Sequence, residues 1–159
     1  MKVAVLVDTN VWVSALLNPS GPPAQLKNAW VDGLFDVIVC LPVLEEIADV
    51  LQRPRIQRKY KIHKHEIVQY LRLITGRAIL VPVTGTVTGC RDPDDNLLLE
   101  AAITGGAKYL VTRDDDLKRD LDLILQMRQH GVRVVSVSQF LKTLRPRSRR
   151  RLPSHQGGS

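Results

Sequence analysis

Acidic side chains gather in four short stretches of the chain, and each stretch lies where an apolar run ends. The stretches span residues 7–10, 44–47, 92–96 and 112–116. The apolar runs before the first, second and fourth are typical of β-strands, and side chains just beyond the carboxyl ends of parallel strands converge on one crevice. Carboxylates brought together there would repel one another unless a cation lay between them. The pattern therefore predicts a divalent-metal site.

Asp8 is the candidate ligand of the first stretch, because it ends a strand-like run and precedes a helix. The position favours a metal ligand, and the alternative is a purely structural helix N-cap. Asn10 follows at the same edge and could orient a neighbouring carboxylate through a hydrogen bond.

Helical geometry separates the two glutamates of the second stretch. Val43, Leu44 and Ile47 belong to one apolar face of the expected helix. Glu46 borders this face and can reach a crevice at the sheet edge, whereas Glu45 points toward solvent. An ion pair on a solvated rim is an almost equal alternative for Glu46.

The third stretch combines a helix start with two further acids. Asp92 is expected to be the N-cap, with Pro93 in the first turn, where its missing N–H costs nothing. Asp94 and Asp95 fall in the same turn, where the helix dipole stabilises an anion. Residue spacing does not choose between them.

The fourth stretch carries three consecutive aspartates, Asp114, Asp115 and Asp116. One of them could cap the next helix, but three exceed what a cap needs. The hydroxyl of Thr112 can hydrogen-bond a neighbouring carboxylate or a water molecule. Each stretch has a structural alternative, yet four acidic stretches at strand ends together favour the metal site.

Oxygen ligands of this kind suit Mg²⁺ or Mn²⁺, and no cluster of histidine and cysteine competes for zinc. The sequence contains no Ser-His-Asp pattern, nucleophile elbow or glycine-rich phosphate loop. The chemistry that fits is metal-activated water attacking a phosphodiester, with one ion or with two ions about 3.5–4 Å apart.

The elements that position these residues alternate in type. Short β-branched runs separated by helical periods are typical of βαβ units with a parallel sheet. Strands are expected at residues 3–8, 35–41, 78–82, 108–112 and 132–137. Helices are expected at residues 10–17, 23–32, 43–52, 64–76, 93–105, 115–130 and 138–144. Pro54 is expected to end the third helix before a short basic turn at residues 56–61.

The net charge of +7 is concentrated at the carboxyl end. Six of the 23 basic residues follow residue 141 and no acidic residue does, so residues 1–141 hold 17 basic against 16 acidic residues. This tail could hold an RNA backbone; the alternative is a solvated, disordered end, which the lack of an aromatic side chain favours. The candidate RNA-binding residues are Arg113, Arg145, Arg147, Arg149, Arg150 and Arg151.

Length and composition fit one domain over residues 1–144, followed by the basic tail at residues 145–159. No stretch approaches the roughly 20 apolar residues of a membrane span, and no signal peptide is expected. Cys40 and Cys90 stand in separate segments, which indicates reduced thiols in a cytoplasmic protein.

The four stretches, in this order and spacing, resemble the PIN-domain ribonuclease family over about residues 3–141. Within that family the chain is most similar to the toxins of prokaryotic toxin–antitoxin systems. The resemblance implies a three-layer α/β/α fold with a central parallel sheet of about five strands in the order 3-2-1-4-5. It also implies dependence on Mg²⁺ or Mn²⁺, a homodimer and a small antitoxin partner.

The resemblance places the catalytic, metal-binding carboxylates at Asp8, Glu46, Asp95 and Asp114, with Asp116 as a further ligand. Asn10 and Thr112 match supporting polar positions. The choice of Asp95 over Asp94 comes from the resemblance alone. The arginine-rich end lies outside the family motif.

The function expected is a metal-dependent endoribonuclease on single-stranded RNA, as the toxin of a toxin–antitoxin pair. One alternative is a non-catalytic RNA-binding module with a vestigial acidic pocket. Another is a small-molecule phosphohydrolase or phospho-acceptor receiver. The last is disfavoured because no second aspartate stands two positions after Asp8 and Lys108 begins its strand at the wrong edge.

Overall fold

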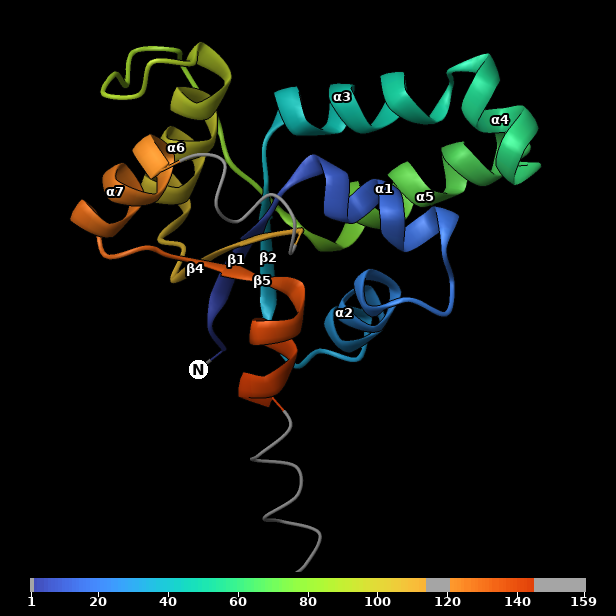
Figure 1. The fold of residues 1–159 in the computed structure, drawn as a ribbon, viewed down its shortest axis with the longest axis horizontal. Helices are drawn as coiled ribbons and strands as arrows, with labels where there is room; N and C mark the ends of the chain where they lie inside the picture. The colour runs from blue at the N-terminus through green and yellow to red at the C-terminus, as the bar shows by residue number, and fades with distance from the viewer. Residues whose placement is uncertain (1, 114–120, 145–159) are drawn as a thin grey trace, which may run out of the picture.

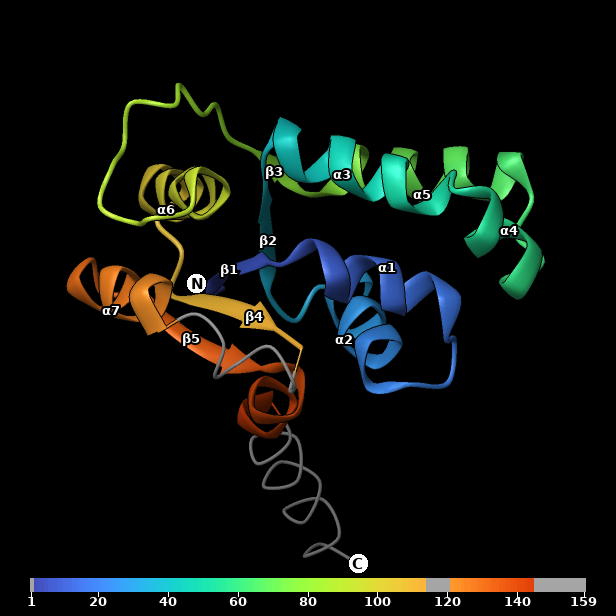
Figure 2. The same cartoon turned by 45° about the horizontal axis from the view of Figure 1, so that its top comes forward.

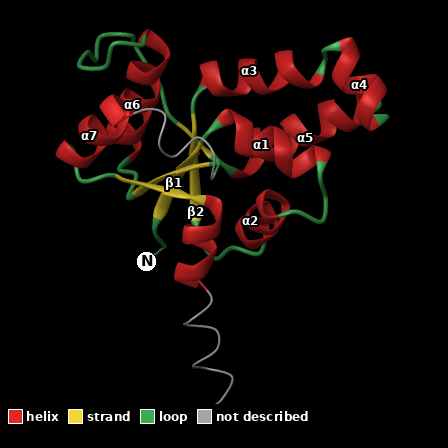
Figure 3. Ribbon diagram, viewed as in Figure 1, coloured by secondary structure: helices red, strands yellow, loops and turns green. Residues whose placement is uncertain are grey.

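The computed structural model describes residues 2–113 and 121–144 and is built around one parallel sheet (Figures 1 and 3). Its strands are ordered β3-β2-β1-β4-β5, which confirms the predicted order and the α/β fold class. All five predicted strands are present: β1 (Ala4–Val7), β2 (Asp36–Val39), β3 (Ile79–Leu80), β4 (Tyr109–Thr112) and β5 (Arg133–Ser136).

The predicted helices are also present within the described ranges. They are α1 (Thr9–Leu17), α2 (Pro22–Val31), α3 (Leu41–Leu51), α5 (Lys64–Arg77), α6 (Pro93–Gly105), α7 (Leu121–Gln129) and a helical segment at residues 137–144. The first part of the helix expected at 115–130 lies outside the described residues, as does the tail at 145–159, so those expectations stay predictions.

One expected turn is a helix. Residues 56–61 belong mostly to α4 (Pro54–Tyr60), which has Pro54 in its first turn and Lys61 as its C-cap. Proline ends a preceding helix, but its fixed φ also suits the first position of a new one. The predicted turn was wrong because Pro54 both ends α3 and begins α4.

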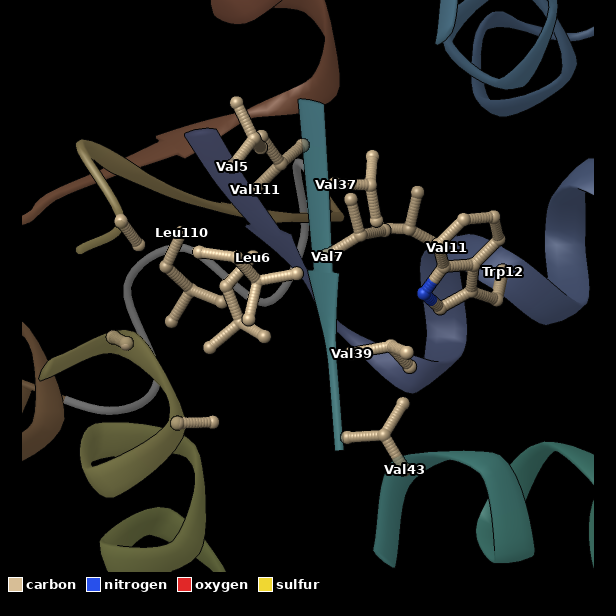
Figure 4. Packing of buried hydrophobic residues seen from close by; sticks show 14 of the residues in the cluster. Val5, Leu6, Val7, Val11, Trp12, Val37, Val39, Val43, Leu110 and Val111 are labelled. Atoms are coloured by element: carbon tan, nitrogen blue, oxygen red, sulfur yellow. The ribbon is translucent and has the colours of Figure 1, made fainter. Parts of the chain in front are cut away.

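Helices cover both faces of the sheet (Figure 2). Because successive side chains of a strand point to opposite faces, Val7 and Val37 pack toward Val11 and Trp12 of α1, whereas Leu6 and Leu110 lie on the α6 side (Figure 4). Leu6, Leu110 and Val37 are no more than 1% exposed. The absence of polar alternation in these strands follows from this two-sided burial.

A glycine allows α6 to approach the sheet closely. A Cβ atom on Gly105 would lie 2.6 Å from Cδ1 of Ile38, inside van der Waals contact. Glycine at this position therefore sets the depth of α6 and, with it, the position of its amino-terminal turn.

The topology creates one place where strand order reverses. From β1 the chain builds outward through β2 to β3, then returns to place β4 and β5 on the other side of β1. The backbone N–H of Asp8 donates to the carbonyl of Val111 over 3.0 Å, so the carboxyl ends of β1 and β4 stay together. Ligands of open parallel sheets bind at such a reversal point.

Within the described ranges, no helix is both long enough and apolar enough to cross a membrane. Cys40 and Cys90 are both buried and neither forms a disulfide.

Candidate active site

A pocket of about 200 Å³ lies at the carboxyl end of the sheet. Three segments that are distant in sequence meet there, beside the point where the strand order of the sheet reverses. The lining residues are Asp8 and Thr9; Cys40, Pro42, Val43 and Glu46; and Asp94, Leu97 and Leu98. Three of them, Asp8, Glu46 and Asp94, are acidic. Two of the four predicted catalytic carboxylates, Asp8 and Glu46, therefore line the pocket.

Asp8 joins β1 to α1. Its backbone is extended, with φ −67° and ψ 151°, and its Oδ1 accepts a hydrogen bond of 2.7 Å from the N–H of Thr9. The side chain thus caps α1, as the structural alternative expected, while it is half-buried at the pocket wall. One carboxylate has two oxygens, so capping and ligand binding do not exclude each other.

The structure separates the two glutamates of α3. Both Glu45 and Glu46 are exposed, yet only Glu46 lines the pocket. Val43, one turn before Glu46, is buried at the same wall. The helical geometry therefore placed Glu46 correctly relative to the pocket; its role as a ligand stays a prediction.

The first turn of α6 brings a different aspartate to the pocket from the one that the resemblance selects. Asp92 is the N-cap and accepts from the N–H of Asp94 over 2.9 Å, which confirms that prediction. Asp94 is exposed and lines the pocket with Leu97 and Leu98, its neighbours one turn further along. Asp95 is half-buried and is not among the lining residues.

Three other predicted site residues, Asn10, Thr112 and Arg113, lie near the ends of β1 and β4. Thr112 is 6% exposed and its hydroxyl donates to the carbonyl of Arg113 over 3.1 Å. Asn10 and Arg113 are exposed. Asp114 and Asp116, together with Arg145, Arg147, Arg149, Arg150 and Arg151, lie outside the described residues.

Helix dipoles favour negative charge in this pocket. α1 begins directly after Asp8, α3 begins after Cys40, and Asp94 is in the first turn of α6. The amino-terminal end of a helix carries a partial positive charge that stabilises an anion within the first turn. Burial raises the pKa of the Cys40 thiol above its ordinary value, so this neighbour adds no charge.

Asn96 and Glu100, for which the sequence predicted no role, hold α6 in place. The side-chain amide of Asn96 accepts from the N–H of Cys90 over 2.8 Å and donates to its carbonyl over 3.2 Å. Glu100, 6% exposed, accepts from the N–H of Thr84 over 2.6 Å, from the Thr84 hydroxyl over 2.9 Å and from the N–H of Gly85 over 3.0 Å. These bonds fix the long connection from β3 to α6.

Glu100 could have been recognised from the sequence, because it interrupts the apolar run at residues 97–103. A buried acid requires hydrogen-bond donors. The backbone N–H groups of Thr84 and Gly85, with the Thr84 hydroxyl, hold the pKa of Glu100 below its ordinary value.

The donor set fits a hard divalent cation. Asp8, Glu46 and Asp94 supply carboxylate oxygens, which suit Mg²⁺ or Mn²⁺. Within residues 2–113 and 121–144 no three acidic, histidine or cysteine side chains lie close enough together to hold an ion. Two further predicted ligands, Asp114 and Asp116, lie outside those ranges.

Known proteins resemble the chain in sequence and in fold. An uncharacterized protein of Methanocaldococcus jannaschii is 27% identical over 144 residues, which cover 89% of this chain and 92% of that protein. The crystal structure of VapBC2 from Rickettsia felis, bound to a DNA fragment from its promoter, matches with a TM-score of 0.50 and 14% identity, over 84% of this chain and 98% of that chain. This second likeness is one of fold. Residues 4–116 match the PIN domain family, and the chain belongs to it.

Proposed function

We propose that the protein is a metal-dependent endoribonuclease that cleaves single-stranded RNA. The observation that carries the proposal is the convergence of Asp8, Glu46 and Asp94 from three separate elements on one pocket at the reversal point of the sheet. PIN domains are typically nucleases and generally bind a divalent metal. No other acid–base or nucleophilic arrangement was found in the sequence.

The ion would be held by Asp8, Glu46, Asp95 or Asp94, and Asp114, with Asp116 as a further ligand. When bound, Mg²⁺ or Mn²⁺ supplies the positive charge that activates water and stabilises the leaving oxygen of the phosphodiester. Asn10 and Thr112 would orient these carboxylates. Arg113 follows β4 directly and could pair with a phosphate of the substrate.

The proposal extends to a toxin of a toxin–antitoxin pair, acting in the cytoplasm as a homodimer that a small antitoxin neutralises. The support is the similarity of fold to VapBC2, which was solved with promoter DNA, together with the resemblance of the acidic motifs. Co-expression with the product of an adjacent reading frame tests the antitoxin. Failure of every neighbouring product to bind the chain would remove this part of the proposal.

The test of the nuclease is cleavage of a labelled single-stranded RNA in the presence of Mn²⁺. Asp8→Asn should lower the cleavage rate by at least about 100-fold, because it removes one ligand charge with little change in shape. Glu45→Gln is the matched control: it removes a carboxylate from the same edge of the molecule without touching the pocket, and should cleave like the wild type. Equal activity in all three proteins contradicts the proposal.

The second candidate, an RNA-binding module without catalysis, is favoured by one observation. The described acids do not by themselves form a cluster of three. Calorimetric titration distinguishes the two: a nuclease binds Mn²⁺ and loses that binding in Asp8→Asn, whereas a module binds RNA and shows no saturable Mn²⁺ binding.

A further inference from the structure

A second charged region lies far from the acidic pocket, on α4 and the start of α5. Residues 53–65 contain no acidic side chain. Their exposed basic residues that form no ion pair with another described residue are named here the α4 cluster: Arg55, Arg58, Lys59, Lys61 and Lys64. Arg53 is set apart because it pairs with Asp49 over 3.1 Å, the one salt bridge found within the described ranges. Figures 1 and 2 show α4 at the far end of α3, away from α6 and α7.

Local helix stability does not account for the α4 cluster. Arg58 and Lys59 occupy the last turn of α4, where cations are favourable. Arg55 is in the first turn of α4 and Lys64 begins α5, where the dipole opposes a positive charge. Lys61 adopts a left-handed backbone, with φ 54° and ψ 44°, a position that normally selects glycine or asparagine. Three of the five cations are thus unfavourable to the local fold.

Aromatic side chains are interleaved with these cations. Tyr60 is 39% exposed, and Nζ of Lys59 lies 5.3 Å from the centre of its ring. His63 and His65 stack with their rings 5.7 Å apart and 12° from parallel. Proteins that bind single strands combine a positive surface for the backbone with aromatic rings on which bases stack. The basic tail at residues 145–159 contains no tyrosine, tryptophan or phenylalanine.

One surface hollow extends from the end of α4 to the residue that follows β4. A hollow of about 450 Å³ is lined by Ser14, Leu17, Asn18, Pro22, Pro23, Tyr60, Arg113, Val137 and Ser138. One of these residues, Tyr60, ends α4; another, Arg113, directly follows β4 beside Asp8. Between them, α1 supplies two of the lining residues, Ser14 and Leu17, and its C-cap Asn18 supplies a third.

We propose that the α4 cluster binds the sugar–phosphate backbone of single-stranded RNA, with a base stacked on Tyr60 and the strand continuing along α1 to Arg113. The proposal rests on the proposed function and deepens it, because it names the surface that holds the substrate. An acidic protein segment would satisfy the charges alone. The exposed ring of Tyr60 and the hollow that extends from it to Arg113 favour the nucleic acid.

The experiment measures the dissociation constant of a labelled single-stranded RNA by fluorescence anisotropy at several NaCl concentrations. All proteins carry Asp8→Asn, so that no RNA is cleaved. Arg58→Gln, Lys61→Gln and Lys64→Gln are combined in one variant. The matched control removes three exposed cations elsewhere, with Arg72→Gln, Arg128→Gln and Arg133→Gln.

The cluster variant should weaken binding about 10-fold or more at 0.1 M NaCl. The slope of log affinity against log salt should fall by about 2, since each lost contact with a single strand contributes about 0.7. The control variant should change the dissociation constant less than about 2-fold. Tyr60→Leu should weaken binding at every salt concentration without changing the slope, because it removes stacking and no charge.

Equal losses in the cluster and control variants would show general attraction to a basic protein and overturn the proposal. Competition by polyglutamate as effective as that by unlabelled RNA of equal charge would also overturn it, since the surface would then suit an acidic protein. Thermal unfolding of each variant verifies the fold. Cleavage by the unmutated chain is scored separately: RNA binding that depends on the cluster without any cleavage rejects the nuclease and leaves this surface standing.

Discussion

The acidic pocket and the α4 cluster are assembled in opposite ways. The pocket takes Asp8, Glu46 and Asp94 from three segments separated by dozens of residues, held by parallel strand pairing and by helices that pack on the sheet. The α4 cluster comes from one short stretch, lies on the surface, and includes no buried residue in α4.

The difference follows from what each region is proposed to do. Metal ligands must be held within a fraction of an ångström, so their supports are rigid and buried. Attraction to a phosphate backbone depends on charge density and tolerates small displacements. Single substitutions should therefore have large effects in the pocket and small, additive effects in the cluster.

The largest effect that tests this contrast is expected for the adjacent glutamates of α3. Glu46→Gln should lower kcat for RNA cleavage by about 100-fold, because it removes a carboxylate from the pocket wall. Glu45→Gln should leave kcat within about 2-fold of the wild type. The two variants differ by one residue in position and by nothing in chemistry. Similar rates for both would mean that the pocket is not the reacting centre.

A second pair of variants tests which aspartate of α6 acts in the pocket. Asp95→Asn should reduce cleavage more than Asp94→Asn, since the family resemblance assigns the ligand to Asp95. Asp94 lines the pocket in the structure, so a loss of about 10-fold is expected there. Steady-state rates at saturating Mn²⁺ give the order. The reverse order would transfer the ligand role to Asp94.

A smaller effect is expected where the two regions are joined. The Tyr70 hydroxyl of α5 donates to the carbonyl of Trp12 in α1 over 2.6 Å, and the side chain is 5% exposed. Tyr70→Phe should lower the free energy of unfolding by about 1 kcal/mol, as expected for one buried hydrogen bond. RNA affinity and cleavage should both stay within 2-fold. A loss of cleavage at unchanged stability would show that the pocket depends on this link.

The smallest effect concerns the stability of the fold at low pH. The pKa of Glu100 is lower in the folded protein than its ordinary value of 4.5. The contribution of Glu100 to the free energy of unfolding is therefore fully present above its ordinary pKa. It is lost as the pH falls through the lower pKa of the folded protein. Urea unfolding between pH 7 and pH 3 should show a shallower acid decline for Glu100→Gln than for the wild type. Parallel declines would mean that Glu100 is not the carboxylate responsible.

Much of the fold followed from local patterns. Short β-branched runs separated by helical periods predicted a parallel sheet, and the helix expected at residues 93–105 has the bounds of α6. The helix α4 was missed because a proline gives the same signal for the end of one helix and the start of the next.

The site was harder to predict. Whether a side chain reaches the pocket depends on how closely its helix packs on the sheet and on how that helix is rotated, as well as on the residue type. The spacing distinguished Glu46 from Glu45, since a helix face decides it. It could not rank Asp94 and Asp95, because Leu97, Leu98 and Leu99 leave the buried direction of α6 ambiguous. The hydrogen bonds of Glu100 to Thr84 and Gly85 depend on the path of a long connection, which no periodicity describes.

The central claim is that carboxylates from distant parts of the chain hold a divalent ion at one edge of the sheet. Anomalous diffraction from a crystal soaked in Mn²⁺ tests it most directly. The account predicts a manganese peak within coordination distance, roughly 2.0–2.3 Å, of oxygens of Asp8 and Glu46. A crystal with no peak in this pocket, or with manganese bound only at an unrelated surface acid such as Asp49, would contradict it.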